Sequence, residues 1–187
     1  LAPELEEASG VDTQFHLRDR LILAFDDSEV RRAKEEIKWQ KDIKGFHVEW
    51  LDQPDVLKVE PRTNPECLGA SYAQGTGAIE AYRYNLAAAQ AAEKFGAEFL
   101  LRRVTGLLSQ GGRCTGVTLE TGQIEAGAVV LAVGPWSQQA AGWCGVKLPV
   151  SPLKGQVVRL QLTTDSMRAS LNYDGSYAAS KPDGLIW

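Results

Sequence analysis

The residues best suited to chemistry follow an apolar run in the second half of the chain. Residues 128–133 read Ala-Val-Val-Leu-Ala-Val and are followed by Gly134, Pro135 and Trp136. In an open α/β sheet, ligands bind beyond the carboxyl ends of the strands, where small residues let the backbone approach a phosphate or a ribose. Ala132 and Gly134 leave that space. A buried strand that enters a turn also uses alanine and glycine, so the pattern alone leaves both a nucleotide site and an ordinary strand end open.

No other pattern predicts a catalytic group or a metal site. His16 and His47 have no partner at metal-ligand spacing, and we expect both to be structural or surface histidines. Asp26, Asp27 and Asp52 fit turns and helix caps better than a carboxylate pair. The sequence contains no nucleophile elbow, Walker loop or HExxH pattern. We therefore assign no catalytic residue and no metal ligand.

Composition and charge narrow the class of protein. The chain has 187 residues, 44% apolar and 24% charged, which is enough to bury the core of one domain or of two small ones. A net charge of -4 with both signs interleaved argues against a nucleic-acid or membrane surface and leaves small polar ligands open. No run approaches the roughly 20 apolar residues of a membrane span. The 3 cysteines, outside any CxxC motif, predict reduced thiols and a cytoplasmic protein.

The first third of the chain predicts an α+β segment. Residues 15–25 alternate apolar and polar side chains, with Arg18 and Arg20 between the leucines, as in a half-buried strand. Ser28 is the predicted N-cap of a charged, mostly solvated helix over residues 28–44. Three further elements follow, namely a strand over 48–51, a short helix capped by Asp52 and a strand over 68–73.

The composition changes after Gly77, where a Gly-Thr-Gly junction predicts that the chain crosses between domains. An alanine-rich helix over 81–95, ended by Gly96, and a short strand over 98–101 are typical of the second half of a βαβ unit. The remaining predicted elements are a hairpin over 104–120, a strand over 123–125, a parallel strand over 128–133, a long strand through Val157, Leu160 and Leu162, a strand over 173–179 and a returning strand over 185–187.

Several short motifs follow one another in an informative order. They are the alanine-rich helix with Gly96-Ala97, Val104 at the start of a hairpin, Gly116-Val117, Thr121-Gly122, residues 129–137, Leu148-Pro149-Val150 and Lys154-Gly155-Gln156. Their order and spacing are similar to those of the FAD-dependent D-amino-acid oxidase superfamily, which includes glycine oxidase and sarcosine oxidase. The resemblance is strongest over residues 77–159 and weaker over residues 11–60.

The resemblance implies a fold class of α/β plus α+β, with a partial Rossmann-like FAD-binding domain and an antiparallel-sheet substrate domain. The substrate domain would comprise residues 1–77 and 146–187, and the FAD-binding domain residues 78–145. Since the chain begins at Leu1 and stops within an apolar run, we expect it to be the central part of a longer protein. The family's GxGxxG turn and its carboxylate-binding arginine would then lie outside this chain.

The resemblance also implies roles for individual residues. Val104 matches the position whose backbone meets the adenine ring, and Ala132, Gly134 and Trp136 match the segment that lies against the flavin nucleotide. Tyr177 resembles the tyrosine that reaches the substrate carboxylate in amino-acid oxidases, although Ser180 stands where a proline is usual. Each residue also has an alternative explanation without a ligand. The alternatives are an ordinary strand valine for Val104, the end of a strand for Ala132 and Gly134, a core tryptophan for Trp136 and a surface tyrosine for Tyr177.

The implied function is oxidation of the C–N bond of an amino acid or small secondary amine, by hydride transfer to FAD. We expect FAD in the longer parent protein and weak or no FAD binding by this chain alone, which would then be inactive. Two alternatives stay open, a non-catalytic binding module and an NAD(P)-dependent dehydrogenase. The expected partner is a small-molecule amino acid or amine, without nucleic acid or a membrane span.

Overall fold

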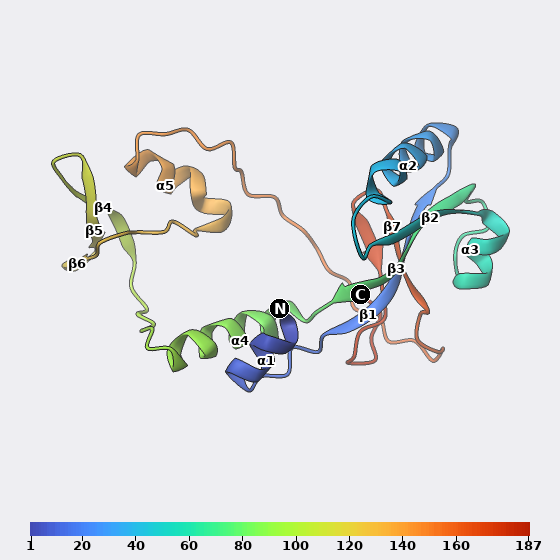
Figure 1. The fold of residues 1–187 in the computed structure, drawn as a ribbon, viewed down its shortest axis with the longest axis horizontal. Coiled ribbons are helices and arrows are strands. Elements are labelled where there is room, and N and C mark those ends of the chain that lie inside the picture. The colour runs from blue at the N-terminus through green and yellow to red at the C-terminus, as the bar shows by residue number, and fades with distance from the viewer. The chain divides into compact units, whose positions relative to one another are not determined.

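The computed structural model describes residues 1–187, which form two compact units (Figure 1). The first unit consists of Leu1–Ala97 and Val157–Trp187, and the second of Glu98–Gln156. These bounds differ from those of the predicted domains, because helix α4 (Ala81–Lys94) packs against helix α1 (Ala2–Ser9) within the first unit. The assignment of the two units to substrate and cofactor stays a prediction.

A five-stranded sheet with the order β2-β3-β1-β7-β8 organises the first unit. Neighbouring strands are antiparallel except for β1 and β7, which are parallel. The strands are β1 (His16–Ala24), β2 (His47–Asp52), β3 (Gly69–Ala78), β7 (Ala169–Tyr173) and β8 (Ser176–Ala178). The strand predicted over residues 15–25 is therefore the central strand of the sheet.

Two helices pack on opposite faces of this sheet. Helix α3 (Gln53–Val59) places Val56 in a core cluster with Ala70 and Tyr72, whereas helix α2 (Asp27–Gln40) places Ile37 against Ala73. Because successive strand residues point to opposite faces, Ala70 and Tyr72 lie on one face and Ala73 lies on the other. The register of β3 is thus fixed by apolar contacts on both sides.

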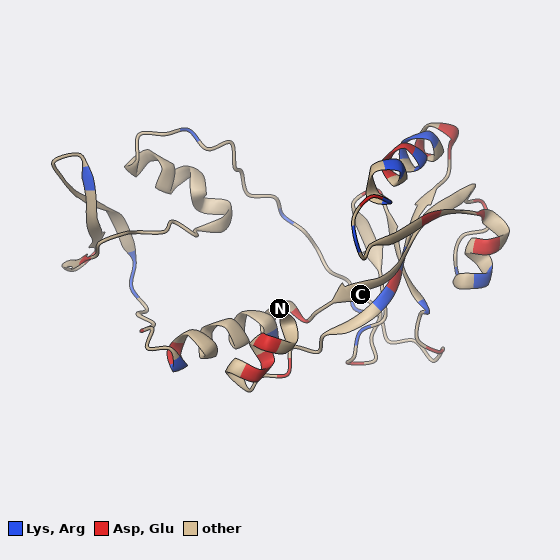
Figure 2. Cartoon of the chain, in the orientation of Figure 1, with Lys and Arg blue, Asp and Glu red and all other residues tan.

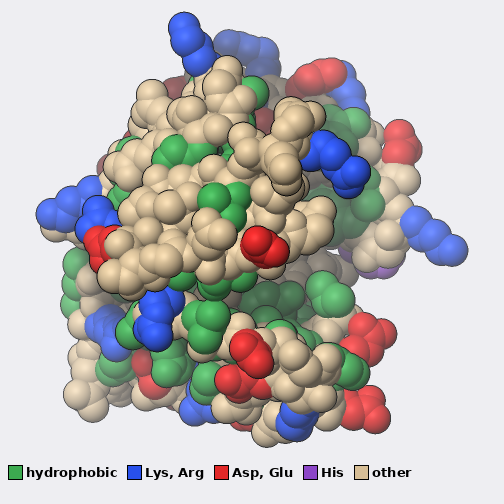
Figure 3. Space-filling model, turned by 90° about the vertical axis from the view of Figure 1, so that its left-hand side faces the viewer, with side chains coloured by type: hydrophobic (Ala, Val, Ile, Leu, Met, Phe, Trp, Pro, Cys, Tyr) green, Lys and Arg blue, Asp and Glu red, His purple; other side chains and the backbone are tan.

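Helix α2 begins earlier than predicted, because Asp26 rather than Ser28 is its N-cap. The Asp26 Oδ1 atom accepts hydrogen bonds from the backbone N–H groups of Ser28 (2.8 Å) and Glu29 (2.9 Å). The helix also ends four residues before the predicted position, at Gln40. Acidic and basic side chains follow one another along it (Figure 2), and the face of the molecule in Figure 3 likewise mixes both signs of charge.

The prediction of a flexible junction at residues 75–77 is wrong, because these residues lie within strand β3. Gly77 pairs with Leu17, and Thr76 pairs with Arg18. A Cβ atom at residue 77 would lie only 3.0 Å from the ring of Phe15. The glycine therefore permits the Phe15 ring, which comes just before β1, to lie close to β3.

A buried carboxylate joins the two parts of the first unit. Glu60 is fully buried, and it accepts hydrogen bonds from Arg62 Nε (2.7 Å) and from the backbone N–H of Arg168 (2.8 Å). Arg62 also donates to the carbonyl oxygens of Asp165 (2.7 Å) and Ser166 (3.0 Å). Burial raises the pKa of Glu60, but the hydrogen bonds from Arg62 and Arg168 outweigh burial and hold this pKa below its usual value.

The second unit contains an antiparallel sheet with the order β4-β5-β6. Its strands are β4 (Val104–Gln110), β5 (Arg113–Leu119) and β6 (Gln123–Glu125), which confirms the predicted hairpin and third strand. A single 3-10 turn, η1 (Gly134–Trp136), leads into the short helix α5 (Ser137–Trp143).

The strands predicted over residues 98–101 and 128–133 are absent, and so is the long strand through Val157. Leu101 is 97% exposed and Val130 is 88% exposed. A strand needs a neighbour to pair its backbone groups, and no strand of this chain lies beside these segments. Of the long strand, only Leu160 pairs, through an isolated bridge to Ile186.

The last part of the chain forms a hairpin where one strand over 173–179 is predicted. Strand β7 ends at Tyr173, and Asp174 and Gly175 take positive φ angles of 45° and 73° before β8 begins. The returning strand predicted over 185–187 is reduced to isolated bridges, in which Ile186 pairs with Ser180 and Leu160. None of the helices combines the length and apolar composition that a membrane crossing requires.

We predict that Glu60→Gln lowers the free energy of unfolding by about 2–3 kcal/mol at pH 7, because it removes the buried charge that accepts hydrogen bonds from the Arg62 guanidinium and the Arg168 N–H. Since the pKa of Glu60 is lower in the folded state, the unfolded state binds more protons in acid. The stabilisation is present above the unfolded pKa near 4.5 and is lost as the pH falls through the folded value. Urea unfolding at pH values above and below this range measures the difference.

The matched control is Glu66→Gln, which removes an exposed carboxylate a few residues away. We expect the control to retain the pH dependence of the wild type and Glu60→Gln to flatten it. Equal pH dependence in the two variants would contradict the role of Glu60.

Candidate functional site

The four residues assigned to the cofactor line one hollow in the second unit. Val104, Ala132, Gly134 and Trp136 all lie in its wall, and the hollow has a volume of about 740 Å³. Val104 comes from the start of strand β4, whereas the other three come from the segment around turn η1. The structure therefore brings together two stretches that are well separated in the sequence.

Val104 lies on a strand with a free edge. In the order β4-β5-β6, strand β4 pairs with a neighbour on one side only. An edge strand presents unpaired N–H and C=O groups, which can bind a planar heterocycle through hydrogen bonds. Any side chain that suits a strand is compatible with such a contact, so the residue type itself carries little signal.

Turn η1 opens the other wall of the hollow. Gly134 has a φ angle of 54°, and nothing lies within 4 Å of the place that a Cβ would take. The Ser137 hydroxyl donates a hydrogen bond to the Gly134 carbonyl oxygen (2.6 Å), which fixes the turn. Trp136 is 61% exposed, so it is not a core tryptophan in this chain. Its indole is free to stack on a ligand.

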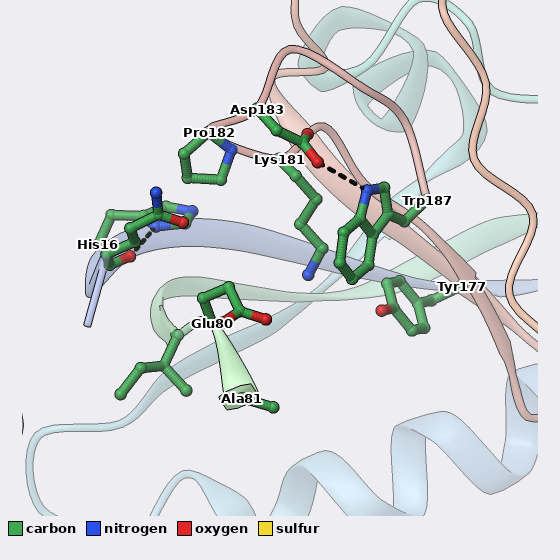
Figure 4. A pocket seen from close by; sticks show the side chains of 10 residues that line it. His16, Glu80, Ala81, Tyr177, Lys181, Pro182, Asp183 and Trp187 are labelled. Carbon is green, nitrogen blue, oxygen red and sulfur yellow. Dashed lines mark hydrogen bonds between the residues drawn. The ribbon is translucent and has the colours of Figure 1, made fainter. Parts of the chain in front are cut away.

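Tyr177 lines a different hollow, in the first unit, with a volume of about 170 Å³ (Figure 4). The Lys181 ammonium lies 5.4 Å from the centroid of the Tyr177 ring and 5.2 Å from that of the Trp187 ring. Asp183 accepts a hydrogen bond from the Trp187 indole N–H (3.2 Å). The Tyr177 hydroxyl has no protein partner, and its side chain is 49% exposed, so it is available to a ligand.

Ser180, which stands in place of the usual proline, has a structural role. It is 4% exposed, and its hydroxyl oxygen accepts a hydrogen bond from the backbone N–H of Met167 (2.7 Å). Its backbone also pairs with Ile186. The substitution therefore keeps the chain beyond Tyr177 in place through hydrogen bonds.

Sequence reasoning missed Arg18, Arg20 and Lys181, which line a further hollow beside Tyr177. The alternation in residues 15–25 predicts that both arginines lie on the solvent-exposed face of a strand. In the structure, both arginines are half-buried. The spacing of two residues between the arginines places both side chains on one face of the strand, and this spacing is the sequence feature that indicates a shared site. His16, as expected, has a structural contact, since its Nδ1 lies 2.9 Å from the Gln14 carbonyl oxygen.

We predict that Gly134→Ala lowers the free energy of unfolding of the second unit by about 1 kcal/mol, because a side chain disfavours a left-handed φ angle. Gly127→Ala is the matched control, since this glycine also has open space around its Cβ position but no positive φ angle. Urea unfolding followed by tryptophan fluorescence compares the two. Equal effects would contradict the left-handed turn at residue 134.

Comparison with known proteins gives one consistent result. The whole chain, residues 1–187, matches the protein family described as FAD dependent oxidoreductase. It is 31% identical to hydrogen cyanide synthase subunit HcnC of Pseudomonas aeruginosa over 186 residues, which cover 98% of this chain and 44% of that protein. It is 32% identical to glycine oxidase of Geobacillus kaustophilus over 164 residues, 86% of this chain and 43% of that one.

The comparison of structures agrees with the comparison of sequences. The crystal structure of glycine oxidase from Geobacillus kaustophilus superposes with a TM-score of 0.85 at 27% identity, covering 99% of this chain and 50% of that one. The resemblance and the mixed α/β fold class predicted from the sequence are thereby confirmed. The chain spans about half the length of the relatives that it matches.

Proposed function

The chain belongs to the FAD-dependent oxidoreductase family, and on that premise we propose that it is the central part of an enzyme that oxidises the C–N bond of an amino acid or a small secondary amine. One observation carries the proposal: Val104 and the segment from Ala132 to Trp136 line the same hollow. The family favours FAD over NAD(P) as the cofactor. The names of the glycine oxidases among its relatives support a small amino acid as the substrate.

The hollow in the second unit fits the nucleotide side of FAD. The free backbone edge at Val104 would bind the adenine ring, and the open space beside Ala132 and Gly134 would admit the ribose and phosphate backbone. The exposed indole of Trp136 would cover the bound nucleotide. When bound, FAD supplies the acceptor for a hydride from the carbon next to the amine nitrogen.

The protein groups of the first unit orient the substrate. The Tyr177 hydroxyl, which has no protein partner, would donate a hydrogen bond to the substrate carboxylate. Loss of the hydride from the neutral amine leaves an iminium ion, which becomes an imine when its nitrogen gives up a proton, and water hydrolyses it. Since the flavin accepts the electrons, the protein needs to position the amine and no nucleophile is required.

The unpaired segments in the second unit indicate what the rest of the parent protein supplies. Residues 98–101 and 128–133 are extended and apolar, yet Leu101 and Val130 are almost fully exposed. We infer that strands of the longer protein pair with them and complete a parallel sheet. The 187-residue chain then holds only part of the cofactor site.

The first test concerns the cofactor. We predict that the full-length protein retains FAD, and that anaerobic addition of glycine, sarcosine or a D-amino acid bleaches its yellow colour. A full-length protein that never retains flavin would contradict the proposal. The 187-residue chain should bind FAD far more weakly, and tight stoichiometric binding by this chain would contradict the partial site.

The second test concerns Trp136. We predict that Trp136→Ala weakens FAD binding by the full-length protein by about tenfold, the loss expected for one aromatic stacking contact. The stability of the 187-residue chain should change little, because the side chain is 61% exposed there. Trp39→Ala is the matched control, since Trp39 is 60% exposed but lies on helix α2. Titration of the apoprotein with FAD gives both affinities, and equal affinities would exclude Trp136 from the cofactor site.

A further inference from the structure

The sheet of the first unit carries a cluster of cationic side chains beside Tyr177. A hollow of about 180 Å³ adjoins the one in Figure 4. The two hollows share Tyr177, Lys181 and His16. The second hollow is also lined by four further polar or charged side chains, those of Arg18, Arg20, Thr76 and Ser170.

The register of the strands places these groups on one face. Arg18 and Arg20 are alternate residues of β1, so their side chains point the same way. Arg20 pairs with Ser170 of β7, and Tyr177 of β8 pairs with Asn172, two residues beyond Ser170. The face is thus continuous from β1 to β8, and helix α2 packs on the same face against Val48 of β2 and Ala73 of β3.

The two arginines have no anionic partner. Neither forms an ion pair, and Arg20 Nε is buried without a hydrogen-bond partner. Burial lowers the pKa of Arg18, which is a sign of poor solvation. The intervening Asp19 lies on the opposite face, where its carboxylate accepts hydrogen bonds from the Tyr72 hydroxyl and the Gly75 N–H. A poorly solvated cation without a partner is unfavourable, so this hollow is suited to an anion.

The two acidic side chains of the adjoining hollow, Glu80 and Asp183, accept hydrogen bonds from N–H groups of their own segments. Glu80 accepts a hydrogen bond from the Arg83 N–H at the start of α4 (2.7 Å), and Asp183 accepts hydrogen bonds from the backbone of Leu185 and the Trp187 indole. The Lys181 ammonium faces two aromatic rings and forms no ion pair. Glu80 and Asp183 line only the adjoining hollow, so the hollow beside Arg18 is lined by three cationic side chains and by no carboxylate.

We propose that Arg18, Arg20 and Lys181 bind a second carboxylate of the substrate, and that the enzyme therefore prefers amines that carry two carboxylates. The inference rests on the proposed function, in which Tyr177 contacts the first carboxylate. The shared lining of the two hollows lets one small molecule reach both sets of groups. Guanidinium groups suit this task, because they form paired, charge-assisted hydrogen bonds with a carboxylate.

The test compares two closely related amines. Iminodiacetate has two carboxylates, and N-methylglycine is the same secondary amine with one of them removed. Isothermal titration of the 187-residue chain requires no flavin, and we expect iminodiacetate to bind at least about tenfold more tightly. Arg18→Gln and Arg20→Gln should each abolish this preference. The control Arg31→Gln, at an exposed arginine on α2, should retain it.

Three results would overturn the inference: equal affinity for the two amines, an unchanged preference in the folded arginine variants, or inorganic phosphate binding as tightly as iminodiacetate. Circular dichroism establishes folding, and Arg18→Gln decides the question if Arg20→Gln does not fold. A full-length protein that oxidises both amines equally well contradicts the inference alone. A chain that prefers iminodiacetate while the full-length protein lacks flavin contradicts the proposed function alone.

Discussion

The first unit depends on one buried ionic contact. The chain leaves this unit after Ala97 and returns at Val157, and the returning segment must find its place beside β1. Closing so long a connection costs conformational entropy. Glu60 offsets part of this cost, because it accepts the Arg168 N–H, while its partner Arg62 binds the carbonyl oxygens just before β7. Together with the pairing of β7 with β1, this contact fixes the position of the hairpin that carries Tyr177.

The sheet that results has two faces with different tasks. One face buries Leu21 and Tyr72 against helix α3 and provides most of the core. The alternate residues of the same strand, Arg18 and Arg20, lie on the other face with the hairpin residue Tyr177. Because successive residues of β1 point to opposite faces, Leu21 contributes to the core, whereas Arg18 and Arg20 lie on the face where we propose that the substrate binds.

Much of the fold follows from local sequence patterns. The alternation around Leu21, the alanines of α4 and the Gly111-Gly112 turn between β4 and β5 each determine a nearby element, and the structure contains all of them. The failures have non-local causes. Residues 128–133 have a strand's composition, but a strand also needs a neighbour, which no local pattern reveals. Arg18 and Arg20 acquire a role only when β7 and β8 join the sheet from far along the chain. The cofactor role proposed for Val104 rests on the resemblance, because a backbone contact does not restrict the residue type.

The central claim is that the second unit binds the nucleotide side of FAD through the free edge of β4 and the turn η1. Hydrogen–deuterium exchange of the full-length protein, with and without FAD, tests this claim most directly because it reports on backbone groups. The claim predicts slower exchange in the presence of FAD at the start of β4, around Val104, and from Ala132 to Trp136, with little change in strands β2 and β3 of the first unit. Unchanged exchange in both segments of the second unit, with flavin bound, would contradict it.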